Sequence, residues 1–151
     1  MALTAVNLIV SGAQKNNGLK RGDFQRYRNY CTGKVKKIRK SMGFKYSGPK
    51  VKFSSKRIEV ERAKDPRVLH ALLFNAEKNW AHANEIKSLD NAKLKKTKGS
   101  RVKYTIINKL KRSVLWARRL EKLCHEVSEK KSALEAEAYR EYLEGMCLFE
   151  Q

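Results

Sequence analysis

The stretch GDFQRYRNYCTGKVKKIRKSM, residues 22–42, combines one narrow apolar stripe with a dense basic face. Its apolar residues follow one another at intervals of 3, 4, 4, 3 and 4, which places them on one side of an α-helix. They are Phe24, Tyr27, Cys31, Val35, Ile38 and Met42. At about 100° per residue, the opposite side carries Arg26, Lys36, Lys37 and Lys40, while Arg28, Lys34 and Arg39 flank the stripe. The stretch predicts a helix with one buried face and one cationic face in water.

The cationic character continues on both sides of this helix. Between residues 15 and 57, fifteen Lys and Arg stand against one acid, Asp23. Arg21 precedes the helix, and a loop marked by Gly48-Pro49 carries Lys45, Lys50 and Lys52. Aromatic residues are interleaved with this charge, and Tyr30, at the edge of the stripe, is placed to stack on an unpaired base. Basic charge mixed with aromatics indicates a nucleic-acid surface more strongly than a merely solvated face.

The whole chain is strongly basic. Its 151 residues include 35 Lys and Arg against 15 Asp and Glu, which gives a formal net charge of +20 at pH 7. This excess favours a polyanionic partner, and the 41% hydrophobic content argues against a disordered basic tail. The length fits one domain, residues 1–151. Because the last helical pattern stops at CLFEQ without a cap, we expect the N-terminal fragment of a longer protein.

Cysteine and histidine usage argues against a disulfide framework, a metal site and an enzyme. Cys31, Cys124 and Cys147 are odd in number and far apart, which is typical of free thiols in a reducing compartment. The three histidines have no metal-ligand spacing, and no glycine-rich phosphate loop occurs. We expect no cofactor, no small-molecule substrate and no stable membrane insertion, since no stretch approaches the ~18 apolar residues of a membrane span.

Helical periodicity extends over most of the chain and predicts an all-α fold of antiparallel helical hairpins. Further helices are expected over residues 3–16, from Asp65-Pro66 to about residue 92, and after a break at Gly99. A short segment, residues 56–63, favours helix over strand only weakly. A second basic patch is expected from Lys95, Lys96 and Lys98 together with Arg118 and Arg119.

The last helix is expected to begin at a capping box, SALE, in which Ser132 caps the helix and Glu135 reaches back. Its expected inward residues are Leu134, Ala138, Tyr142, Met146 and Phe149.

Several quoted stretches resemble a known family. GLKRGDFQRYRNYCTGKVKKIRKSMGFK, NAEKNWAHANEIK, LKRSVLWARRLEKLC and ALEAEAYREYLEGMCLFE, in this order, are similar to the RNA-binding domain of the 68 kDa protein of the signal recognition particle. GDFQRYRNYC and EAEAYREYLEGM are the most specific parts of the resemblance.

The resemblance implies a tetratricopeptide-like helical bundle that binds the structured RNA of the particle near a junction of its S domain. It implies that an arginine-rich helix, corresponding here to residues 21–40, bends the RNA and remodels a neighbouring loop. It also implies partners among the other particle proteins and a role in co-translational protein targeting to the endoplasmic reticulum. The implied location is the cytoplasm, with a nuclear or nucleolar assembly stage. The 72 kDa partner binds a C-terminal part of the family protein that this chain is expected to lack.

Lys34, Lys36, Lys37 and Lys40 stand where the family's helix is arginine-rich, so we expect phosphate contacts there more than base contacts. Arg26 and Arg28 are the best candidates for bidentate phosphate or base contact. Two alternatives stay open from the residues alone. One is a basic interaction module for an acidic protein or an anionic membrane, and the other is a DNA-binding helical domain.

Overall fold

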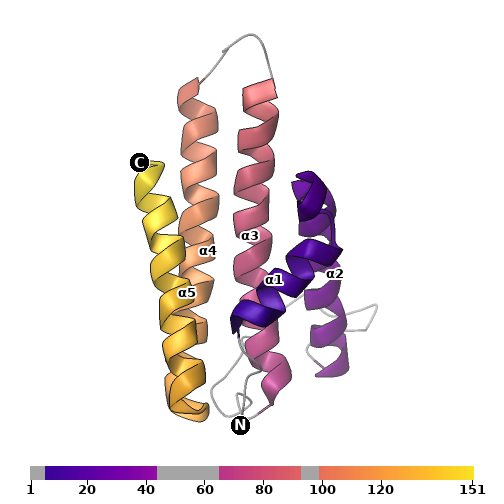
Figure 1. Cartoon of the computed structure of the whole chain (residues 1–151), viewed down its shortest axis with the longest axis vertical. Coiled ribbons are helices and arrows are strands. Elements are labelled where there is room, and N and C mark those ends of the chain that lie inside the picture. Colours follow the sequence, from indigo (N-terminus) through magenta and orange to yellow (C-terminus); the bar gives the residue numbers. More distant parts are fainter. Residues whose placement is uncertain (1–5, 44–64, 93–98) are drawn as a thin grey trace, which may run out of the picture.

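The structure of the protein is a computed structural model that describes residues 6–43, 65–92 and 99–151. The helices are α1 (Val6–Asn16), α2 (Phe24–Ser41), α3 (Pro66–Ala92), α4 (Gly99–Val127) and α5 (Lys130–Phe149), with a 3-10 turn, η1 (Leu19–Arg21), between α1 and α2. No strand occurs among these described residues. Helices α2, α3, α4 and α5 lie in a row, each antiparallel to the one before it (Figure 1). The predicted all-α fold of antiparallel hairpins is confirmed.

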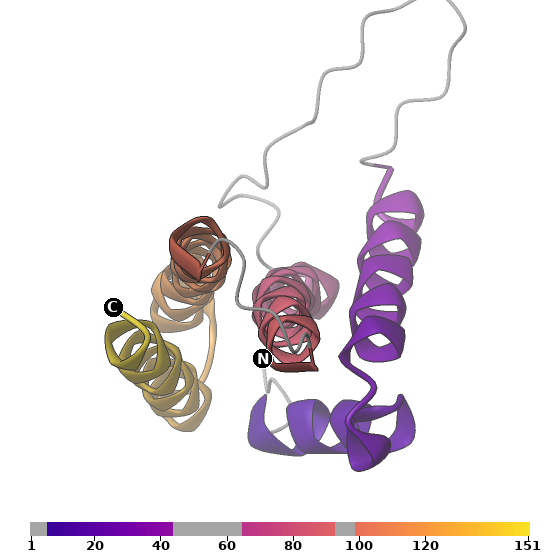
Figure 2. The same ribbon diagram turned by 90° about the horizontal axis from the view of Figure 1, so that it is seen from above.

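Helix α3 is the centre of this row. Figure 2 shows α3 between α2 and α4, with α5 beyond α4 and with α1 and η1 crossing one side of the α2–α3 pair. Because neighbours cover α3 from several directions, polar residues on it are buried together with apolar ones, among them Asn75, Glu77 and Asn79. The predicted short segment at 56–63 and the basic loop before it fall outside the described residues.

Local capping explains where α2 and α3 begin. The carboxylate Oδ1 of Asp23 accepts a hydrogen bond from the backbone N–H of Arg26 at 2.9 Å. Asp65 does the same for the N–H of Arg67 at 2.9 Å, and Pro66 occupies the first helical position. An acceptor at this place satisfies a backbone donor that has no partner within the helix, and proline there loses no helical hydrogen bond. The predicted start at Asp65-Pro66 is confirmed.

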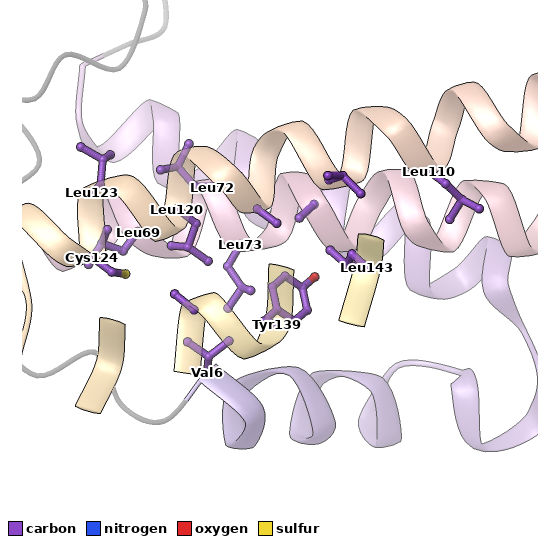
Figure 3. Packing of buried hydrophobic residues seen from close by; sticks show 14 of the residues in the cluster. Val6, Leu69, Leu72, Leu73, Leu110, Leu120, Leu123, Cys124, Tyr139 and Leu143 are labelled. Carbon is purple, nitrogen blue, oxygen red and sulfur yellow. The ribbon is translucent and has the colours of Figure 1, made fainter. Parts of the chain in front are cut away.

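Two apolar clusters hold the helices together. The larger one joins α3, α4 and α5 with Val6 of α1, and Figure 3 shows Leu69, Leu73, Leu120 and Leu143 within it. The smaller one contains the buried part of the predicted α2 stripe, together with residues of α1 and α3; its members are Ala13, Tyr27, Cys31, Val35, Ile38, Ala71, Phe74 and Ala81. The stripe of residues 22–42 is therefore buried, as the sequence predicts, and the structure shows that it docks α2 on α3.

The expectations for α5 were wrong in two respects. The helix begins at Lys130 with Glu129 as N-cap, so Ser132 lies inside the first turn. Glu135 does not complete a capping box but accepts a hydrogen bond from the backbone N–H of Val6 at 2.7 Å, which ties α5 to the start of α1.

The inward face of α5 is also a different one. Leu134, Tyr142 and Phe149, predicted to face inward, are 54%, 56% and 88% exposed. Ala138 is exposed as well, and Met146 is only half-buried. The buried residues are instead Ser132, Ala133, Ala136, Tyr139, Leu143 and Cys147. This face is richer in small residues, which lets α5 pack closely, and it carries a tyrosine whose hydroxyl bonds a buried carboxylate. Close packing and hydrogen bonding therefore decide which face is buried, and the number of large apolar side chains does not.

Candidate nucleic-acid interface

The outward face of α2 is densely cationic. Arg26, Lys36, Lys37 and Lys40 are exposed, as predicted, while the flanking Lys34 is half-buried. They are held in place because the opposite face of α2 is anchored in the smaller apolar cluster. The helix therefore presents fixed charge along its whole length, without acidic residues between Phe24 and Ser41.

A tight turn positions the first of these cations. Gly18 has φ +109°, a left-handed conformation that favours glycine. A Cβ on Gly18 would lie 3.0 Å from the carbonyl oxygen of Asp23 and 3.2 Å from two side-chain carbons of Arg26. The absence of a side chain at Gly18 thus lets the Arg26 stem pack against the turn. Arg21, in η1, is exposed beside it.

Arg28 is held by an acidic partner. Its Nε donates to Oε2 of Glu85 on α3 at 2.5 Å, and a second guanidinium nitrogen donates to Oε1 at 3.3 Å. The side chains of Arg28 and Glu85 are 28% and 14% exposed. The Arg28 guanidinium that was expected to bind RNA is therefore already bonded to a carboxylate in the free protein. An RNA phosphate must displace Glu85 from Arg28 or share the guanidinium with it.

Beside Arg28, three helices bring basic side chains together in a way that the sequence did not reveal. We call this the cationic seam; it comprises Arg28 and Arg39 of α2, Lys78 and His82 of α3, and Lys109 of α4. Burial, followed by the charges of Lys109 and Arg39, lowers the pKa of Lys78. Burial, followed by Lys109 and Arg28, lowers the pKa of His82. Positive charges close together repel one another and disfavour the charged forms of Lys78 and His82. A polyanion bound at the cationic seam would reduce this repulsion.

Lys78, His82 and Lys109 were missed because they sit on separate helices. Lys109 appears in the sequence only as one of many basic residues of α4, and Lys78 and His82 are isolated basic residues among the apolar and polar residues of α3. No local spacing links them. The only available signal was that basic residues interrupt the apolar pattern of α3.

The second predicted patch falls only partly within the described residues. Lys95, Lys96 and Lys98 lie outside them, as do Lys45, Lys50 and Lys52. Arg118 pairs with Glu144 of α5 at 2.7 Å. The guanidinium of Arg119 lies 4.9 Å from the centre of the Trp116 ring, a cation–π distance.

Acidic residues concentrate along α5, away from α2. Arg140 pairs with Glu121, Glu141 and Glu144, and Lys87 pairs with Glu150. Glu121 also lies near His125 and Glu137, with their ligand-type atoms within 4.8 Å of one another. Since Arg140 already supplies a countercharge to Glu121 at 2.7 Å, we interpret this group as part of the α4–α5 ion-pair network. Several acids of α4 and α5 are thus paired with basic side chains, whereas α2 contains no acid between Phe24 and Ser41.

A buried carboxylate ties the basic helix to the rest of the fold. Glu77 of α3 is 2% exposed. It accepts hydrogen bonds from the hydroxyl of Tyr27 at 2.7 Å, the hydroxyl of Tyr139 at 2.5 Å and the amide of Gln14 at 3.0 Å. Burial raises the pKa of Glu77, and the three donors oppose that shift. Glu77 thereby fixes α1, α2 and α5 relative to α3.

The fold and this surface define a class: an all-helical protein whose cationic face suits a polyanion. Residues 19–151 match the family model described as RNA-binding signal recognition particle 68. The chain therefore belongs to the SRP68 family, as its resemblance in sequence indicated. The family consists of RNA-binding subunits of a particle and is not an enzyme family. None of the described helices is long and apolar enough to cross a membrane.

Relatives and a solved structure agree with this assignment. The chain is 38% identical over 152 residues to the signal recognition particle subunit SRP68 of Caenorhabditis elegans, and 32% identical over 147 residues to that of Drosophila melanogaster. Each alignment covers 94% of this chain but only 24% and 23% of the relatives, so the chain spans about a quarter of their length. The SRP68 RNA-binding domain from Chaetomium thermophilum matches with a TM-score of 0.82 and 26% identity, over 96% of this chain and 67% of that one.

Proposed function

We propose that this chain binds the structured RNA of the signal recognition particle through the outward face of α2 and the adjoining cationic seam. The observation that carries the proposal is the continuity of this surface. Arg26, Lys36 and Lys37 are exposed on α2, and the charges of Arg28 on α2 and Lys109 on α4 both act on His82 of α3. Glu141 and Glu144 of α5 and Glu150 at its C-cap are paired with Arg140 and Lys87. A polyanion gains affinity there by releasing counterions.

The target we propose is a junction in the S domain of that RNA, together with the loop next to it. An A-form helix hides its bases in a deep, narrow major groove, so a helix such as α2 enters only where a junction or internal loop widens it. Helix α2 is charged around most of its exposed arc, which suits insertion between two backbones. If α2 binds the RNA backbones on both sides of the groove at once, the RNA bends and the neighbouring loop is remodelled.

Within this proposal the side chains have distinct roles. Lys36, Lys37 and Lys40 neutralise phosphates without fixing their orientation, since an ammonium group is a point charge. Arg26 and Arg28 offer planar forks that bind a phosphate or a guanine edge in two places. Glu85 keeps the Arg28 fork ordered before RNA arrives, at the cost of competing with the phosphate.

The experiment is a titration of this chain with an S-domain RNA fragment over a range of salt concentrations. We expect log affinity to fall with log salt with a slope of about −5 or steeper, which corresponds to roughly six or more neutralised phosphates. Duplex DNA of equal length and anionic vesicles serve as competitors. A shallow slope, or equally tight binding to vesicles, would instead favour the interaction module for an acidic protein or membrane.

Nuclease footprinting on the full particle RNA locates the site. Protection confined to one junction and its neighbouring loop supports the proposed target, and protection spread evenly along paired regions contradicts it. The proposal places the chain beside other particle proteins on the same RNA, in the cytoplasm after a nucleolar assembly stage.

A further inference from the structure

A polar cavity of about 210 Å³ opens where α1 crosses the α2–α3 pair. Its walls include Gly12 and Asn16 of α1, Tyr30 and Lys34 of α2, and His70 and Phe74 of α3. Figure 2 shows that α1 runs along one side of that pair. On a helix, the side chains of Tyr30 and Arg28 point about 160° apart, so this cavity and the cationic seam flank α2 on different sides.

The groups around the cavity are those that hold a nucleobase. Tyr30 and Phe74 supply aromatic surface, and their ring centres lie 6.0 Å apart in an edge-to-face arrangement. Asn16 and Asn17 bring amides to the rim, and Lys34 brings a cation. Burial, followed by the charge of Lys34, lowers the pKa of His70, so a neutral imidazole that both donates and accepts faces the same space. The volume lies below the ~300 Å³ at which sites for drug-sized ligands begin.

The cavity is also continuous with the basic face of α2. Residues three or four apart on a helix are surface neighbours. Arg26, Tyr30, Lys34 and Lys37 follow at intervals of 4, 4 and 3, so Tyr30 and Lys34 stand in one column with two exposed cations. A backbone held by Arg26 and Lys37 would therefore pass directly over the mouth of the cavity.

We propose that this cavity takes one unpaired base, extruded from the RNA that α2 grips, with the base against Tyr30 and its phosphate near Lys34. This inference rests on the proposed function and goes further, because it assigns a base-binding pocket to the α1 side of the molecule. Extrusion is cheapest for a base that is already unpaired in a loop. The pocket thereby selects looped RNA over a plain duplex.

A glycine in the wall supplies the test. Gly12 lines the cavity, and a Cβ built on it meets no other atom within 4 Å, so Gly12→Leu adds a bulky side chain at the cavity wall without a clash at that carbon. Leucine also favours helix over glycine, so the variant should fold at least as well as the wild type. Gly145 of α5 likewise has nothing within 4 Å of an added Cβ. Gly145→Leu is therefore the matched control, because α5 and α2 lie at opposite ends of the row of helices in Figure 1.

Binding is measured to two RNAs of equal length, an S-domain fragment with its loop and the same fragment made fully paired. Since stacking a base on an aromatic side chain contributes about 1–3 kcal/mol, Gly12→Leu should weaken binding of the looped RNA by roughly tenfold or more. Gly12→Leu should not change the affinity for the fully paired RNA. Gly145→Leu should change the affinity for neither RNA. Photocrosslinking with 4-thiouridine in the loop should label peptides that contain Tyr30 or Phe74 in the wild type and lose that label in Gly12→Leu.

The outcomes separate the two proposals. If the wild type binds looped RNA and Gly12→Leu binds it equally well with unchanged crosslinks, the base pocket is wrong and the proposed function stands. If the wild type shows no salt-dependent RNA binding, the proposed function fails and the pocket with it.

Discussion

Gly18 shows how a single residue without a side chain shapes the surface of this protein. Its left-handed backbone turns the chain from α1 into α2, and its bare Cα leaves room for the stem of Arg26. Arg26 is thus fixed from two directions, by the Asp23 cap on its backbone and by Gly18 on its side chain.

We expect Gly18→Ala to weaken RNA binding several-fold by displacing Arg26. Gly22→Ala is the matched control, because Gly22 also has a positive φ, +72°, but an added Cβ there meets nothing within 4 Å. Each substitution should cost about 1 kcal/mol of stability from backbone strain, measured by urea unfolding, and Gly18→Ala should cost more because its Cβ also crowds the carbonyl oxygen of Asp23. Only Gly18→Ala should change the affinity for the S-domain fragment. Equal loss of affinity in both variants would show that the turn, and not the Arg26 contact, matters.

At the scale of elements, α2 separates docking from binding. One face is buried in the smaller apolar cluster, and the other carries charge that contributes nothing to the core. Charge on the outward face can therefore be removed without loss of the helix.

The triple substitution of Lys36, Lys37 and Lys40 to Gln should reduce the magnitude of the salt slope by about 2–3, because each lost phosphate contact removes nearly one unit. Glutamine has a helix propensity close to that of lysine, so circular dichroism should not change. The same substitutions at Lys122, Lys130 and Lys131, exposed on α4 and α5, remove equal charge elsewhere. A similar change of slope in this control would mean that overall charge, and not α2, drives binding.

The elements differ in how far local pattern determined them. The stripes of α2 and of α4, where Ile106, Leu110 and Leu120 are buried, follow from spacing alone, because each of these helices has one clearly apolar side. In α5 two sides compete, and the pattern of Leu134 and Phe149 looked more apolar than the buried one. Packing against α4 and the hydrogen bond from Tyr139 to Glu77 decided otherwise.

At the scale of the whole molecule, Glu77 is the residue through which four helices meet. Its carboxylate lies between the two apolar clusters and binds donors from α1, α2 and α5. Burial also raises the pKa values of Tyr27 and Tyr139, so both hydroxyls keep their protons and stay donors.

This arrangement predicts a pH dependence of stability. The pKa of Glu77 is raised on folding, so its protonated form is favoured in the folded state. Its stabilising contribution is complete below the unfolded value of about 4.3 and declines as pH rises through the folded pKa. Glu77→Gln cannot titrate, so the free energy of unfolding of wild type minus that of the variant should fall with rising pH, by about 1.4 kcal/mol per unit of pKa shift.

Urea titrations of both proteins at several pH values from about 4 to 8 measure that difference. A difference that stays constant, or grows with pH, would show that the three hydrogen bonds outweigh burial and keep Glu77 ionised.

By itself, the sequence determined the helical class, the docking stripe and outward cations of α2, and the family, because these depend on residues near one another along the chain. Only the tertiary structure decided the cationic seam, the pairing of Arg28 with Glu85, the cavity under α1 and the buried face of α5. Each joins residues more than thirty positions apart or sets one helix face against another, and local periodicity carries no information about which neighbour a side chain meets.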